Sequence, residues 1–94
     1  MVIADLDEVT FDLEVDGEQV RRQMSRRVWE RAGWATIACA YEERSAQGEW
    51  KAKVALLRFR REHDVWKRQA AITLPASEAR ELADAMQAFV ATAS

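Results

Sequence analysis

Apolar and polar residues alternate along Thr10–Val15, so that its apolar side chains fall on one side of the chain. This two-residue period predicts a half-buried β-strand. The dipeptide Asp16-Gly17 follows it, and this pair is favoured in the type I′ turn of a β-hairpin. We therefore expect a hairpin here, with Leu13 lying opposite Val20 in the next strand.

The segment from Glu18 to Ala32 fits either a strand or a helix. As a helix it has Asp16 as its N-cap and Gly33 as its C′ residue, and its composition tolerates the helical state. Its apolar stripe, however, is only one residue wide, which is narrower than the apolar face that a packed helix needs. The matched pairs of the expected hairpin favour the strand. Both alternatives stay open at this point.

Three further strands are predicted from alternation and from short apolar runs, at Trp34–Tyr41, Glu49–Arg61 and Val65–Leu74. The centre of the second strand, Val54–Leu57, is apolar on both of its faces. That pattern is typical of a strand in the middle of a sheet that is covered on both sides.

Apolar residues recur at spacings of three and four from Ala76 to Ala93, which predicts an amphipathic helix. Pro75 is well suited to the first turn of that helix. The fold class that follows is α+β, an antiparallel β-meander of four to five strands followed by one C-terminal α-helix packed on the sheet. We expect a single domain over 1–94, with an acidic N-terminal strand or arm (1–18), a basic β-meander (19–74) and the helix (75–93).

The chain has 94 residues, of which 49% are hydrophobic and 32% are charged. These values are ordinary for one soluble globular domain and argue against disorder. No basic region precedes an apolar stretch at the N-terminus, so no signal peptide is visible, and no run is long enough to span a membrane. Cys39 is the single cysteine and cannot form an internal disulfide. We expect a cytoplasmic protein without membrane contacts.

The net charge of −2 conceals a strong asymmetry along the chain. Residues 1–20 hold seven acids and no base, whereas residues 21–68 hold thirteen bases and six acids. Most of the bases are arginines, which can chelate phosphate and stack on nucleobases. The basic segment therefore predicts a polyanionic or acidic partner. Alternatively, the acidic arm pairs with the basic segment inside one fold, or it binds a protein partner of its own.

Catalytic signatures are lacking in this sequence. It has no glycine-rich phosphate loop and no cysteine–histidine cluster with metal spacing. Cys39 lies in the apolar run Ala35–Tyr41, where a buried and unreactive thiol is expected. We predict that the protein is not an enzyme and uses neither a cofactor nor a metal ion.

From Ser25 to Ala93 the order of predicted elements resembles one repeat of the PUR (purine-rich-element-binding) domain and the related coactivator family called positive cofactor four. Three stretches carry the resemblance: Ser-Arg-Arg-Val-Trp-Glu-Arg (Ser25–Arg31), Ala-Gln-Gly-Glu-Trp-Lys-Ala-Lys (Ala46–Lys53) and the strand-to-helix junction Ala71–Leu82. The resemblance implies a four-stranded antiparallel sheet with one long helix, binding of single-stranded DNA or RNA by the sheet, and pairing of two units.

We accordingly predict a single-stranded nucleic-acid-binding module, a bacterial-type accessory protein in transcription or nucleic-acid maintenance. Such binding needs cationic side chains interleaved with aromatic ones. The candidate residues, expected together on the sheet face opposite the helix, are Arg27, Trp29, Arg31, Trp34, Lys51, Lys53, Phe59 and Arg61.

We also expect a homodimer, because one helix would leave Ala55, Leu57 and Phe59 bare on the other face of the sheet. The alternative function is a protein-interaction or oligomerisation module that binds no nucleic acid. The acidic overall charge favours that alternative, since a dedicated nucleic-acid binder is usually basic. The acidic arm could also mask the basic face of the sheet.

Overall fold

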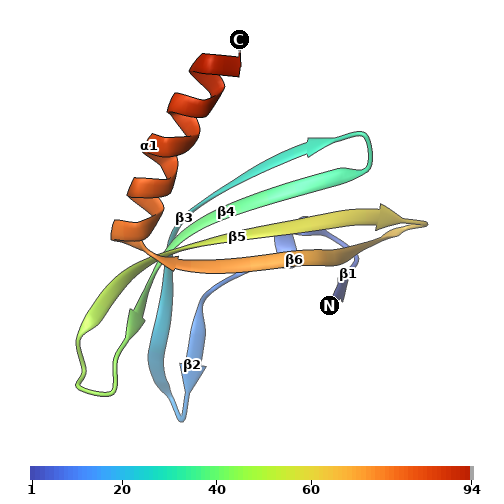
Figure 1. Cartoon of the computed structure of the whole chain (residues 1–94). Coiled ribbons are helices and arrows are strands. Elements are labelled where there is room, and N and C mark those ends of the chain that lie inside the picture. Colours follow the sequence, from blue (N-terminus) through green and yellow to red (C-terminus); the bar gives the residue numbers. More distant parts are fainter. Residues whose placement is uncertain (94) are drawn as a thin grey trace.

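The computed structural model describes residues 1–93, which form one antiparallel sheet and one long helix (Figure 1). The elements are β1 (Val2–Ile3), the 3₁₀ helix η1 (Leu6–Glu8), β2 (Leu13–Val15), β3 (Glu18–Arg31), β4 (Trp34–Arg44), β5 (Trp50–Glu62), β6 (Val65–Pro75) and α1 (Ala76–Ala93). The strand order is β1-β6-β5-β4-β3-β2, and every neighbouring pair is antiparallel. Strands β2 to β6 thus form a meander, and the short β1 joins its far edge.

The segment from Glu18 to Ala32, whose sequence fits either a strand or a helix, forms a strand. β3 occupies Glu18–Arg31 and follows a turn in which Asp16 and Gly17 both have positive φ angles, of 53° and 81°. Positive φ at both central residues defines the type I′ turn, whose twist matches that of the flanking strands. The pairing differs from the expectation in one place, because a register shift sets Leu13 opposite Arg21 instead of Val20.

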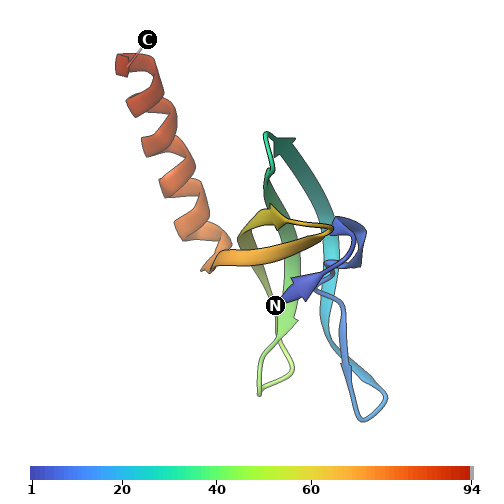
Figure 2. The same cartoon turned by 90° about the vertical axis from the view of Figure 1, so that its right-hand side faces the viewer.

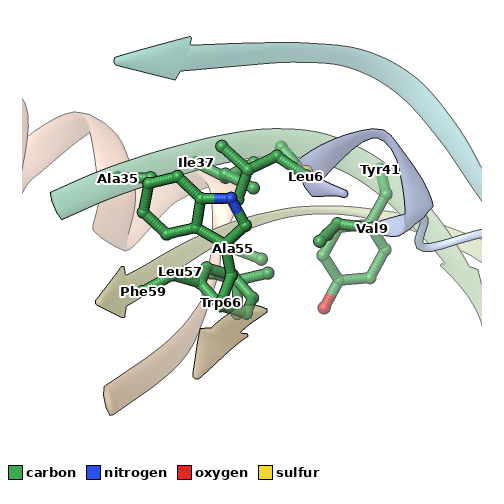
Figure 3. Close-up of a cluster of buried hydrophobic side chains, with 10 residues drawn as sticks. Leu6, Val9, Ala35, Ile37, Tyr41, Ala55, Leu57, Phe59 and Trp66 are labelled. Carbon is green, nitrogen blue, oxygen red and sulfur yellow. The ribbon is translucent and has the colours of Figure 1, made fainter. Parts of the chain in front are cut away.

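Side chains alternate between the two faces of the sheet, and one face is far more buried than the other. We call the buried side the core face; its buried strand residues are Cys39 and, as labelled in Figure 3, Ala35, Ile37, Tyr41, Ala55, Leu57, Phe59 and Trp66. We call the opposite side the helix face. It carries the intervening residues of β4 and β5, such as Thr36 and Leu56, and part of it lies against α1.

The N-terminal segment covers the core face. Leu6 and Val9 keep only 8% and 7% of their surface exposed and lie over the buried side chains of the strands (Figure 3). Arg26 of β3 holds this segment against the core face, because its Nη1 donates hydrogen bonds to the backbone oxygens of Leu6 and Val9, at 3.2 and 3.0 Å. Its Nη2 lies 3.0 Å from the carboxylate of Asp7.

This arrangement overturns the stated basis for a dimer. Ala55, Leu57 and Phe59 were expected on a bare face, but they are 0%, 5% and 0% exposed beneath the chain's own N-terminus. The acidic segment likewise covers the core face, so it does not mask the basic residues of the helix face.

The predicted four- or five-stranded sheet with a helix packed on it is wrong. The sheet has six strands and bends into a half-barrel, and α1 leaves the end of β6 and extends away from it (Figures 1 and 2). None of its described side chains is buried, and Leu82 and Phe89 are 43% and 68% exposed. The main contacts of the helix are with β5 and β6, because it starts at one end of the sheet and points outward. The meander and the single C-terminal helix are present as expected.

Candidate functional site

Three strands bring tryptophan and arginine side chains together on the helix face, next to the β3–β4 turn. The strand register forms a row in which Arg31 lies opposite Trp34 and Trp34 lies opposite Arg60. The next row is Trp29, Thr36 and Arg58, and the third is Arg27, Ala38 and Leu56. We name the aromatic and cationic members of these rows the arginine–tryptophan platform: Arg27, Trp29, Arg31, Trp34, Arg58 and Arg60.

Contacts within the platform hold its side chains in place. The guanidinium carbons of Arg58 and Arg60 lie 4.8 and 5.4 Å from the centre of the Trp34 ring, within cation–π distance. Arg58 Nη1 also donates a hydrogen bond to Thr36 Oγ1, at 2.9 Å. In the neighbouring strand the Arg27 guanidinium carbon lies 5.0 Å from the Trp29 ring. The two indoles are thus flanked by cations while part of their surface stays accessible.

The platform contains a shallow hollow of about 300 Å³. Its walls are Trp29, Arg31, Ala32, Trp34, Thr36 and Arg58. Trp29, which forms one wall, is 48% exposed. An aromatic ring entering this hollow would meet the indoles, and its charged substituents would meet the arginines.

The platform arginines have no carboxylate partner. The six ion pairs among residues 1–93 use other cations, for example Arg22 with Glu42 and Lys67 with Glu62, each at 2.8 Å. Arg27, Arg31, Arg58 and Arg60 do not take part in any of them. Their charge is therefore not neutralised by the described part of the chain, and it is available to an external anion.

Four of the eight predicted site residues lie in the platform, but the other four lie on the core face. The residues that come together are Arg27, Trp29, Arg31 and Trp34, and those on the core face are Lys51, Lys53, Phe59 and Arg61. Because Trp34 pairs with Arg60, the odd-numbered residues of β5 point to the opposite side from the indoles. The platform also shares its face with α1, whereas we expected it opposite the helix.

Three of these four core-face residues contact other parts of the chain, whereas Lys51 is exposed. Phe59 is completely buried. Lys53 Nζ lies 2.9 Å from Glu43 Oε1, and this hydrogen bond raises the pKa of Lys53. Arg61 lies 5.7 Å from the Trp66 ring and lines a hollow of about 330 Å³ together with acidic residues that include Asp7. Acidic neighbours make that hollow unfavourable for a polyanion.

Arg58 and Arg60 are the platform residues that our prediction did not include. They flank Phe59 in the sequence Arg58-Phe59-Arg60, and Phe59 is a core residue. Alternation then places both arginines on the other face. The sequence carries this signal, but it becomes readable only once the face of Phe59 is known.

The other candidate chemistry has no support in the geometry. Cys39 is 1% exposed, and burial raises the pKa of its thiol, which makes the reactive thiolate form less favourable. Within residues 1–93, no group of histidine, cysteine and acidic side chains is arranged to hold a metal ion. The same part of the chain contains no helix with the length and apolarity required to span a bilayer.

Comparison with known proteins found no match to any protein-family model, curated protein or solved structure. The resemblance to the PUR domain and to positive cofactor four therefore stays a prediction made from the sequence.

Proposed function

We propose that this protein binds single-stranded nucleic acid on the arginine–tryptophan platform. The observation that carries the proposal is the presence of two accessible indoles and four unpaired arginines on one open surface. Binding of single strands without sequence preference uses this combination, because bases stack on aromatic rings while cations meet the phosphates.

A single strand suits the platform better than a duplex does. The bases of a single strand are free to unstack and present their flat faces, whereas those of a duplex are already stacked on each other. Trp29 and Trp34 offer such faces on adjacent strands of the sheet. Stacking accepts every base, so we expect little dependence on sequence.

The negative net charge does not oppose this proposal, because the charges are separated in space. The acidic N-terminal segment lies over the core face, and its Asp7 is paired with Arg26. The platform is on the other side of the sheet. At physiological ionic strength, charges further apart than about 8 Å are largely screened, so a bound strand responds mainly to the nearest arginines.

Binding of a fluorescently labelled oligothymidylate, followed by anisotropy, tests the proposal. We expect preference for the single strand over a duplex of equal length. Four phosphate contacts predict that log K falls with log salt with a slope of about −3. The paired variants are Trp34→Ala, which removes a platform indole, and Trp50→Ala, which removes an indole located under Arg22 elsewhere on the sheet. Absence of binding by the wild-type chain at low salt would reject the proposal.

An accessory role in transcription or nucleic-acid maintenance is the biological setting that this proposal suggests. A cytoplasmic location belongs to the same proposal, because the single cysteine leaves no internal disulfide that would require an oxidising compartment.

A further inference from the structure

Both long edges of the sheet are only partly covered. β2 pairs with β3 no further than Arg21, so the edge of β3 from Ser25 to Arg31 has no neighbouring strand in the described chain. β1 pairs with β6 only at Trp66 and Lys67, and the backbone N–H of Arg68 donates to Met1 O. The edge of β6 from Gln69 to Pro75 is therefore also open.

The two open edges differ in charge. The β3 edge carries three arginines and Glu30, and a register shift lies next to it at Met24. Charges and bulges are the usual means by which proteins keep edge strands from pairing. The β6 edge reads Ala-Ala-Ile-Thr-Leu-Pro over residues 70–75 and carries no charge. A register shift at Gln69 and Pro75 lie at the two ends of this edge, but residues 70–74 between them are mostly exposed and carry no charge.

An apolar groove adjoins this uncharged part of the β6 edge. It has a volume of about 500 Å³ and lies on the helix face, between the sheet and α1. Leu56 and Ile72 form part of its sheet side, and Leu82 and Met86 part of its helix side. Phe89 extends the same stripe of the helix beyond the groove and is 68% exposed.

The apolar surface exposed here is large for a monomer. Its large side chains are 39–68% exposed and are Leu56, Ile72, Leu82, Met86, Phe89 and Val90. Together they present on the order of 600 Å², which is the upper end of the largest patch on a typical monomer. A standard interface buries about 800 Å² on each partner, so the patch and the adjoining edge supply close to one partner's share.

We propose that a second copy of this chain covers this surface, with the two β6 edges paired antiparallel about a two-fold axis. Two identical strands can pair in this way because residues 70–75 bring no like charges together, whereas two β3 edges would oppose their arginines. A two-fold axis that extends one sheet into the next is perpendicular to it. Both helices then lie on the same side of the joined sheet, where each can fill the groove of the other copy.

This inference goes beyond the proposed function and does not depend on it. The platform lies on β3, β4 and β5, and β5 separates it from the paired backbone edge of β6; its third row ends at Leu56, which also lines the groove, so the two surfaces are adjacent and do not coincide. Both platforms would also face the same side of the joined sheet, because the axis is perpendicular to it.

Light scattering on the full chain without nucleic acid tests the pairing. We expect a mass twice the 10.8 kDa of one chain at micromolar concentration. Ile72→Lys adds a charge to the edge, and Met86→Glu adds one to the exposed stripe of the helix. Each should weaken the dimer at least tenfold. Ser25→Lys, on the open β3 edge, is the matched control and should leave the mass unchanged.

Hydrogen exchange supplies a second measurement that does not require a variant. The outward amides of residues 70–74 should be protected, and their protection should fall as the chain is diluted. A monomeric mass at about 100 μM, with these amides exchanging at once, would overturn the proposal and leave the groove to another occupant. A dimer that both charged variants retain in folded form would overturn it equally.

Discussion

The two faces of the sheet differ in how far they are covered, although neighbouring residues of the same strands form both. On the core face, Phe59 is fully buried beneath the N-terminal segment. On the helix face, Arg58 and Arg60 stand on either side of it in sequence and contact Trp34. The core face closes itself with residues of its own chain, whereas the helix face stays open. The difference indicates that the first face supports the fold and that the second is available for binding.

Two adjacent arginines, one on each face, differ in the same way in the number of their partners. Arg26, on the core side, has three hydrogen-bond acceptors from the N-terminal segment. Arg27, the next residue, points to the helix face and contacts only the ring of Trp29 among the partners observed in residues 1–93. One arginine thus acts as a structural anchor, and its neighbour is free to meet a ligand.

The largest effect should come from uncovering the core face. Leu6→Ala removes most of a nearly buried side chain, and such truncations cost about 2–5 kcal/mol of unfolding free energy. We expect a loss of at least 2 kcal/mol in urea denaturation, and unchanged oligonucleotide affinity for the protein that remains folded. The exposed Leu13→Ala is the control and should stay close to wild type. A Leu6→Ala chain as stable as wild type would show that the N-terminal segment does not close the core.

Removal of a platform indole should reduce binding without reducing stability. Trp34→Ala is expected to cost about 1–3 kcal/mol of binding free energy, the usual contribution of one stacked base. Its thermal unfolding should change little compared with that of Leu6→Ala, because Trp34 lies outside the core cluster. Equal affinities for Trp34→Ala and wild type would remove the indole from the binding site.

A smaller effect on stability is expected at the anchor. Arg26→Lys keeps the charge, but the single ammonium group cannot reproduce the fork that reaches Leu6 O, Val9 O and Asp7. Loss of one or two of these hydrogen bonds should cost about 1–2 kcal/mol in denaturant unfolding. Arg27→Lys is the matched control on the other face. If both variants lost the same stability, the distinction between anchor and free arginine would fail.

Much of the sheet could be predicted from the sequence because short-range signals define it. The Asp16-Gly17 pair marked the position of the first turn, and the spacing over 76–93 matched the range of the helix. The strand before the turn was predicted less well, because β2 spans only Leu13–Val15 and is exposed, whereas a half-buried strand over Thr10–Val15 was expected. The bulge opposite Leu13 could not be read, because no local residue pattern specifies an extra residue in β3.

The site was harder to predict because it depends on which residues of β3, β4 and β5 lie on the same face of the sheet. Trp29 and Trp34 were linked correctly across the short Ala32-Gly33 turn, which sets the register of β3 and β4. The longer loop between β4 and β5 does not fix the register from sequence, so Lys53 and Phe59 were assigned to the platform in place of Arg58 and Arg60. The position of the helix was also missed, since an amphipathic stripe shows that a face is to be covered but not whether the same chain covers it.

The comparison of Arg60→Gln with Arg61→Gln tests the division between the two faces most directly. These residues are adjacent in β5, carry the same charge and point to opposite sides of the sheet. Affinity for labelled oligothymidylate would be measured from about 50 to 200 mM salt. We predict that Arg60→Gln weakens binding and flattens the salt dependence by about one phosphate contact, while Arg61→Gln leaves both unchanged. Equal losses in the two variants, or a loss confined to Arg61→Gln, would contradict binding on the helix face.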